Sequence, residues 1–125
     1  MITGLGVDIL EIARFERTMD RSGERFLARV FTTAEIRYCL AKHHPPQHLA
    51  ARFAAKEAVS KAMATGWAGE FRWKDVEIKN DPAGRPMVTL HGRVQEILAG
   101  SRVLLSISHS DTHVVAVAVI ENGTP

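Results

Sequence analysis

Cysteine is almost absent from this sequence, and that scarcity limits both its covalent chemistry and its location. Among the 125 residues only Cys39 is a cysteine, which excludes an internal disulfide and favours a reducing compartment. The opening stretch MITGLGVDIL lacks the basic segment of a secretory signal, and the longest late apolar run, VVAVAVI, is far too short to span a membrane. We therefore expect a soluble, cytoplasmic protein with no membrane partner.

Aromatic residues and excess charge are also scarce. Aromatic side chains make up 6% of the chain and the formal net charge is only +2, whereas nucleic-acid binding usually needs a strong positive field or aromatic rings among the bases. The available phenylalanines, Phe15, Phe26 and Phe31, are predicted in the core. We expect no nucleic-acid partner, although eleven arginines against five lysines keep a basic binding module as an alternative and favour bidentate contacts to carboxylate or phosphate.

Several well-known site motifs are missing. The chain has no Walker-type loop, no nucleophile elbow and no Ser-His-Asp order. Its histidines show no zinc-ligand spacing with Cys39. Any chemistry must therefore come from residues that the fold brings together.

The apolar pattern predicts one α+β domain over residues 1–125. Its first half is predicted to contain a short buried strand ending at Asp8, a helix from Ile12 that stops near Ser22-Gly23, a helix capped by Thr32 and Glu35, and an alanine-rich helix over roughly 48–64. The second half is predicted to contain two hairpins, 75–79 with 86–90 and 102–108 with 113–121, separated by a short helix over 93–100. We expect antiparallel β-hairpins packed on the alanine-rich helix.

The alanine-rich helix carries an unusual set of charges. Helical geometry puts Ala51, Ala54, Ala55, Ala58 and Ala62 on one face. Glu57 and Lys61 lie along one edge of that face, with Arg52 and Lys56 on the far side. Glu57 and Lys61 fit a solvated surface pair, or a metal-binding carboxylate beside a phosphate-binding ammonium. The second reading needs another carboxylate, and Asp8 is the candidate, its alternative role being a helix N-cap.

The stretch SISHSDTH offers a second group of polar residues. It places Ser106, Ser108, His109 and Ser110 at the predicted tip of an apolar hairpin. Polar residues are expected at any turn, and a neutral histidine flanked by hydroxyls also suits phosphate binding or proton transfer.

Taken together, GVDILEIARFE, RFAAKEAVSKAMATG and VLLSISHS resemble the holo-acyl-carrier-protein synthases, the short bacterial phosphopantetheinyl transferases. The resemblance covers nearly the whole chain in the right order. Its matching positions are Gly6, Asp8 and Arg14; Lys56, Glu57, Ala58 and Lys61; Asn80, Gly84 and Pro86; and Ser108 and His109. In one departure, Ala64 stands before Thr65 and Gly66 where the family usually has glycine.

The resemblance implies a reaction and the residues that carry it. Phosphopantetheine passes from coenzyme A to a serine of apo acyl carrier protein in fatty-acid biosynthesis, releasing adenosine 3′,5′-bisphosphate. Asp8 and Glu57 are expected to hold Mg²⁺, and Glu57 and Lys61 to act in catalysis. Glu57 itself or a metal-bound water could deprotonate the serine, and we prefer a water relayed by Glu57. The expected coenzyme A contacts are Arg52, Lys61, Thr65, Gly66, Gly84, Pro86, Ser108 and His109.

The resemblance also implies partners. We expect a homotrimer with active sites between subunits, and docking of an acidic carrier helix on Arg14, Arg17 and Arg21. Without the resemblance, these arginines fit a solvated face neutralised by nearby acidic residues. Two other functions remain as alternatives: a basic trimeric nucleic-acid- or protein-binding module without catalysis, and a Mg²⁺-dependent phosphatase.

Overall fold

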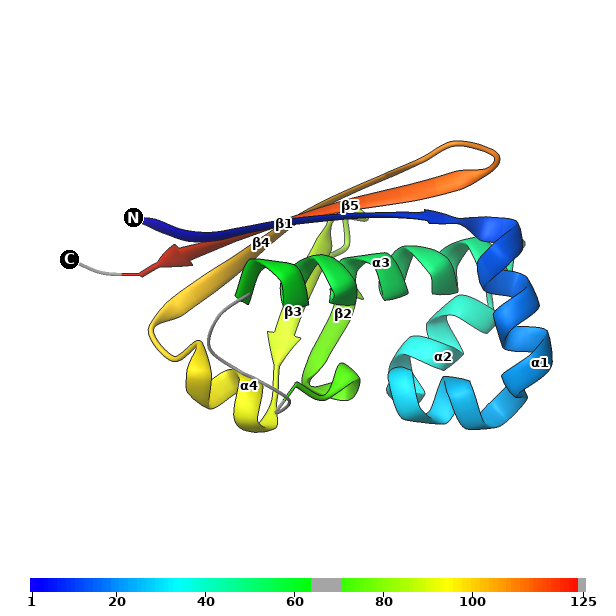
Figure 1. The fold of residues 1–125 in the computed structure, drawn as a ribbon, viewed down its shortest axis with the longest axis horizontal. Coiled ribbons are helices and arrows are strands. Elements are labelled where there is room, and N and C mark those ends of the chain that lie inside the picture. Colours follow the sequence, from blue (N-terminus) through cyan, green and yellow to red (C-terminus); the bar gives the residue numbers. More distant parts are fainter. Residues whose placement is uncertain (64–70, 124–125) are drawn as a thin grey trace.

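Helix α3 (Pro45–Met63) runs through the middle of the molecule, and both sheets pack against it (Figure 1). The computed structural model describes residues 1–63 and 71–123. The other helical elements are α1 (Ile12–Val30), α2 (Thr33–Leu40), the 3₁₀ turn η1 (Trp73–Asp75) and α4 (Gly92–Ile97). The strands are β1 (Ile2–Glu11), β2 (Val76–Asn80), β3 (Pro86–Leu90), β4 (Ser101–His109) and β5 (His113–Asn122). No described helix is long and apolar enough to cross a membrane.

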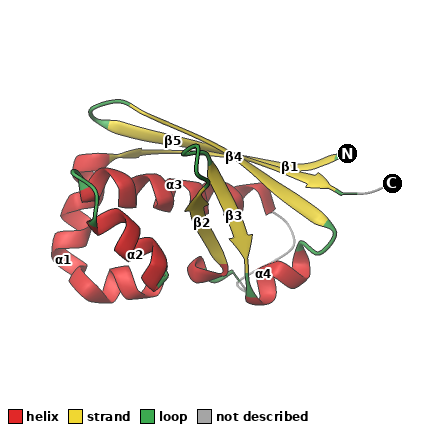
Figure 2. Ribbon diagram, turned by 180° about the vertical axis from the view of Figure 1, so that it is seen from behind, coloured by secondary structure: helices red, strands yellow, loops and turns green. Residues whose placement is uncertain are grey.

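The strands form two antiparallel sheets. β2 and β3 make the first predicted hairpin, and β4 and β5 make the second, to which β1 adds in the order β1-β5-β4. The three-stranded sheet covers one side of α3, and the β2–β3 hairpin crosses a different side of the same helix (Figures 1 and 2). The predicted α+β class, with antiparallel hairpins on an alanine-rich helix, is confirmed.

Small residues let β1 and α3 approach closely. Alternation along β1 turns Gly4, Gly6 and Asp8 toward α3, and a Cβ atom at Gly6 would collide with the carbonyl oxygen of Ala58. The predicted alanine face packs here, with Ala54, Ala55, Ala58 and Ala62 buried. Backbone therefore lies directly against backbone between the strand and the helix.

The strand predictions need two corrections. β1 is neither short nor buried on both faces: it continues to Glu11, Asp8 lies inside it opposite Ala116, and Val7 is 53% exposed. Pairing with the long strand β5 extends β1 past the aspartate. β4 likewise continues to His109, so Ser106 lies within a strand and the turn comes later.

Two helices also differ from prediction. α1 leaves helical geometry at Gly23 (φ 57°, ψ −141°), as the glycine suggested, but then resumes to Val30 because its second half folds back and packs Phe26 on Phe15 (ring centroids 5.8 Å apart). α3 begins at Pro45, since proline is tolerated in the first helical turn.

Candidate active site

Asp8, Glu57 and Lys61 meet where β1 lies against α3. The ammonium of Lys61 lies 3.0 Å from Asp8 Oδ1 and also donates to the carbonyl oxygen of Val7 at 3.1 Å. The Asp8 side chain is only 16% exposed. Because Glu57 lies one turn before Lys61, it faces the same group. We call these three residues the carboxylate site.

The two carboxylates of this site repel each other. Burial raises the pKa of the Glu57 carboxyl above its usual value, the Asp8 carboxylate raises it further, and Lys61 acts in the opposite direction. One ammonium therefore does not fully offset two neighbouring carboxylates. A hard divalent cation with oxygen ligands fits this surplus of negative charge.

Among the residues that the structure describes, Asp8 and Glu57 are the two acidic side chains that the carboxylate site offers such a cation. No cluster of three or more histidine, cysteine or acidic side chains suited to a metal occurs within the described ranges 1–63 and 71–123. A cation bound here takes its other ligands from water or from a substrate, as Mg²⁺ sites on phosphate substrates commonly do.

Basic side chains gather at the opposite end of α3. The amide nitrogen of Gln47 lies 3.2 and 3.3 Å from the two ring nitrogens of His109. Burial lowers the pKa of the His48 imidazole, and nearby basic side chains lower it further: Lys42, Arg52, His109 and His44. This crowding of positive groups, which we call the basic cluster, suits a multiply charged anion.

Arg52 links the basic cluster to the β2–β3 turn. Its Nη2 donates to Asn80 Oδ1 at 2.9 Å, and Asn80 Nδ2 donates to the carbonyl oxygen of Gly84 at 3.0 Å. The guanidinium also stacks 4.2 Å from the Tyr38 ring centroid, while its buried Nε has no hydrogen-bond partner among residues 1–63 and 71–123. Gly84 adopts φ 89°, a conformation that favours glycine. Pro86 lies opposite Asn80 in the hairpin register, so it belongs to this group.

Three of the predicted coenzyme A contacts, Ser108, Thr65 and Gly66, are not part of the basic cluster or of the carboxylate site as described. The register of β4 and β5 turns Ser108 to the outer face of the sheet beside Val115, whereas its neighbour His109 faces the opposite way. Thr65 and Gly66 lie outside the described residues.

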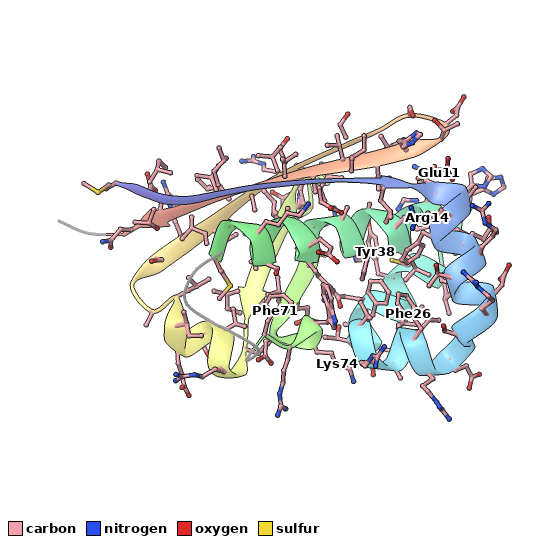
Figure 3. The ribbon with its side chains drawn as sticks, in the orientation of Figure 1. Glu11, Arg14, Phe26, Tyr38, Phe71 and Lys74 are labelled. Atoms are coloured by element: carbon pink, nitrogen blue, oxygen red, sulfur yellow. The ribbon has the colours of Figure 1, made fainter. Side chains whose placement is uncertain are left out.

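The predicted docking arginines line an exposed side of α1. Arg14, Arg17 and Arg21 are all exposed, and within the described part of the chain only Arg17 has an ion pair, to Glu11 at 3.7 Å. Figure 3 shows Arg14 beside Glu11 at the start of α1. A hollow of about 450 Å³ follows at the Gly23 kink, lined by Arg21, Ser22, Arg25, Phe26 and Arg29.

Sequence reasoning missed several residues of this region. Lys56, which helical spacing placed with Arg52 on the side of α3 away from Glu57 and Lys61, is fully buried, and Arg52, a predicted coenzyme A contact, is only 5% exposed. Tyr38, Lys42, Gln47 and His48 join the basic cluster without any local signal, because α2, the turn after it and β4 converge only in three dimensions. Asn80 matched the resemblance, yet its bridging position between Arg52 and Gly84 comes only from the fold.

Comparison with known proteins identifies the family. The sequence model of the 4′-phosphopantetheinyl transferase superfamily matches residues 4–118. A holo-[acyl-carrier-protein] synthase of Koribacter versatilis is 44% identical over 125 residues, covering 98% of this chain and 100% of the relative. The chain belongs to the 4′-phosphopantetheinyl transferase superfamily and, within it, to the holo-[acyl-carrier-protein] synthases.

Solved structures share the fold. The chain matches the holo-[acyl-carrier-protein] synthase of Neisseria meningitidis with a TM-score of 0.86 and 35% identity, covering 97% of this chain and 99% of that one. The enzyme of Bacillus anthracis, solved in complex with CoA (3′,5′-ADP), matches with a TM-score of 0.82 and 36% identity over 98% of both chains.

The raised pKa of Glu57 can be tested by NMR. As the pH falls, wild-type Glu57 should protonate at a higher pH than an ordinary glutamate. It should therefore stop binding cations at a pH where an ordinary glutamate still carries its charge. Asp8→Asn should lower the pKa of Glu57 because it removes a neighbouring anion, whereas Lys61→Met should raise it. The measurement is the Glu57 carboxyl ¹³C shift from about pH 3 to pH 8. Glu96→Gln, on α4, is the control. Equal titrations in wild type and Asp8→Asn would contradict the assigned repulsion.

Proposed function

We propose that this protein transfers phosphopantetheine from coenzyme A to a serine of apo acyl carrier protein and releases adenosine 3′,5′-bisphosphate. The observation that carries this proposal is the placement of the carboxylate site and the basic cluster on one helix, in a chain that belongs to this family. We assign the reaction to residues 1–125 as one domain, and place it in the cytoplasm and in fatty-acid biosynthesis.

Coenzyme A binds along α3 in this proposal. Arg52 and Lys61 are nine residues apart, or about 14 Å along a helix, so only an extended ligand with separated anionic groups engages both. Arg52, His109 and the turn with Gly84 and Pro86 hold the nucleotide end and its 3′-phosphate. Lys61 contacts the pyrophosphate. The solved relative with CoA (3′,5′-ADP) supports a nucleotide ligand of this kind.

The carboxylate site would hold Mg²⁺ through Asp8 and Glu57. When bound, the cation would stabilise the negative charge that develops on the departing phosphate of adenosine 3′,5′-bisphosphate. The fit rests on two carboxylates that face each other, where burial first and then the charge of Asp8 raise the pKa of Glu57.

Glu57 and Lys61 act directly on the reacting groups. A carboxyl whose pKa is raised accepts a proton more readily than an ordinary glutamate, so Glu57 suits removal of the serine proton through an intervening water. Lys61 orients the phosphates by its ammonium charge, and its bond to Val7 anchors it to β1. The serine oxygen then attacks the β-phosphorus and the bond to the departing nucleotide phosphate breaks.

The reaction is tested by incubating the protein with coenzyme A, Mg²⁺ and apo carrier protein and weighing the carrier. Wild type should add one phosphopantetheine group. Asp8→Ala and Glu57→Ala should each slow transfer at least 100-fold, roughly the cost of losing one charge-stabilising group, while circular dichroism stays native because either change relieves repulsion. Glu96→Ala is the control. Release of inorganic phosphate in place of carrier modification would indicate a phosphatase.

The outer face of the three-stranded sheet supports a homotrimer. On the side away from α3 the described residues place no covering element (Figure 1). This face is apolar and exposed over β1, with Leu5 69%, Ile9 67% and Val7 53% exposed, and β4 adds Leu104, 44% exposed, among the polar residues Arg102, Ser106 and Ser108. The register adds Val115, Val117 and Val119 between them. Monomers seldom expose so continuous an apolar surface, and copies of this chain would cover it. Ser108 would then lie at the edge between subunits.

Placing a charge on this face should prevent assembly. Leu5→Glu is expected to sediment as a monomer at concentrations where wild type sediments as a trimer, and to lose transfer activity with it, since active sites between subunits disappear. Met87→Glu is the matched control, because Met87 is 53% exposed but lies on β3. A wild-type protein that sediments as a monomer, or an unchanged Leu5→Glu trimer, would show that this face has another role.

The exposed arginines of α1 provide the docking surface for the carrier. Arg14 and Arg21 have no ion-pair partner in the described part of the chain, so both guanidinium groups remain available to a carboxylate. The Gly23 kink brings Arg25 and Arg29 into the hollow beside Arg21. An acidic helix fits this arginine-lined side.

Charge reversal should separate docking from cofactor binding. Arg14→Glu with Arg21→Glu should raise the KM for the carrier roughly tenfold or more, since complementary charges steer association, and should leave the affinity for coenzyme A unchanged. Arg93→Glu on α4 is the control, because α4 lies far from α1 (Figure 1). Wild-type KM should also rise with salt. Normal modification of the carrier by the double variant at low salt would place docking elsewhere.

A further inference from the structure

A fully buried ion pair joins α2, α3 and β2, outside the site described above. Lys56 Nζ lies 2.9 Å from Glu35 Oε1, and both side chains have no exposed surface. The same ammonium donates to the carbonyl oxygens of Trp73 at 2.9 Å and Val76 at 2.6 Å. All three N–H donors of the lysine are therefore used.

Glu35 holds the main chain from the other side. Its Oε1 also accepts from the backbone N–H of Thr32 at 2.9 Å, as part of the capping box of α2, and its Oε2 accepts from the backbone N–H of Ile78 at 2.8 Å. Two side chains thus fix four backbone groups: Thr32 N, Trp73 O, Val76 O and Ile78 N. Three of these belong to η1 and β2.

These contacts fix the position of strand β2 and therefore of the turn that follows it. Strand β2 ends at Asn80, two residues after Ile78, and Asn80 bonds to both Arg52 and Gly84. Arg52 lies one helical turn before Lys56 on α3. Helix α3 therefore holds β2 at its start through Lys56 and at its end through Arg52.

Stability alone is a weak reason for such a pair. Burying two charges removes their hydration, and apolar side chains of similar volume often stabilise a core equally well or better. Burial lowers the pKa of Lys56, against the opposing influence of Glu35. What an apolar pair cannot supply is directed hydrogen bonding to four backbone groups.

We propose that Lys56 and Glu35 are positioning residues, which hold the β2–β3 turn against Arg52 so that Asn80, Gly84 and Arg52 present one preformed surface to the nucleotide end of coenzyme A. The identity of the ligand, coenzyme A, rests on the proposed function. The hydrogen bonds by which the ion pair positions strand β2 and its turn are present in the chain without any ligand. Neither residue touches the reacting atoms.

The test replaces the pair with apolar side chains of similar size. Lys56→Met alone should lower the Tm by roughly 10 °C or more, because it leaves Glu35 buried and unpaired. Glu35→Met with Lys56→Met should melt above Lys56→Met, because it buries no unpaired charge, but below wild type, because four backbone groups lose their hydrogen-bond partners. In the double variant, amide hydrogen exchange over residues 80–85 should nonetheless quicken at least tenfold, the Kd for coenzyme A should rise about tenfold, and the KM for carrier should stay within about twofold.

Controls separate positioning from general destabilisation. Val30→Ala should lower the Tm by leaving a cavity at a residue that is 1% exposed, without faster exchange over residues 80–85. Glu35→Gln keeps the shape of the side chain but replaces one acceptor oxygen by an amide group. Amide exchange over residues 80–85 and the Kd for coenzyme A should then lie between the wild-type values and those expected for the double variant, and this variant can be measured even if the double variant does not fold. A folded double variant, or a Glu35→Gln variant, with wild-type exchange and wild-type affinity would overturn the proposal.

Failure of the proposed function gives a different result. If the wild-type protein neither binds coenzyme A nor modifies a carrier, the proposed function is wrong. Exchange over residues 80–85 needs no ligand, so it still shows whether the ion pair holds the turn.

Discussion

The contact between β1 and α3 is the constraint on which the active site depends. Gly4 and Gly6 offer no side chain, and the alanine face of α3 offers only methyl groups, so the strand backbone lies against the helix backbone. At this separation Asp8, the next inward residue of β1, lies within the electrostatic reach of Glu57. A larger side chain at Gly6 would push the helix away and separate the two carboxylates.

Helix α3 divides its charges among three environments. Glu57 and Lys61 lie at the edge of β1, Arg52 lies under the β2–β3 turn, and Lys56 is buried with Glu35. The negative surplus at one end and the positive surplus at the other create a field along the helix. A ligand that carries phosphates at both ends and binds a cation at one of them matches that field. The helix is therefore at once the core of the fold and the floor of the proposed cofactor site.

The surfaces not used by this helix carry the proposed protein contacts. The sheet face away from α3 is apolar over β1 and β5, whereas the exposed side of α1 is rich in arginine. These two chemistries suit different partners. An apolar face suits a permanent contact between copies, and an exposed charged side suits a transient, salt-sensitive encounter.

Local sequence determined those features that depend on near neighbours. The capping box of Thr32 and Glu35 starts α2 as expected, because its bonds join residues three apart. Both hairpins and the alanine face of α3 followed from alternation, turn residues and helical spacing. The motif pattern singled out Asp8, Glu57 and Lys61 as one group, and the structure brings them together.

Tertiary structure decided what those periodicities could not. Adjacent residues Lys56 and Glu57 have the same helical propensity and both carry charge, yet one is buried and the other lies at a site. The difference arises because Lys56 pairs with Glu35 and Glu57 faces Asp8, and both partners come from distant parts of the chain. Ser108 and His109 are likewise neighbours in sequence, but the pleat of β4 sends them to opposite faces. Sequence determined which side chains were available, and long-range packing decided which of them meet, because burial and partner choice depend on contacts between segments that no local pattern specifies.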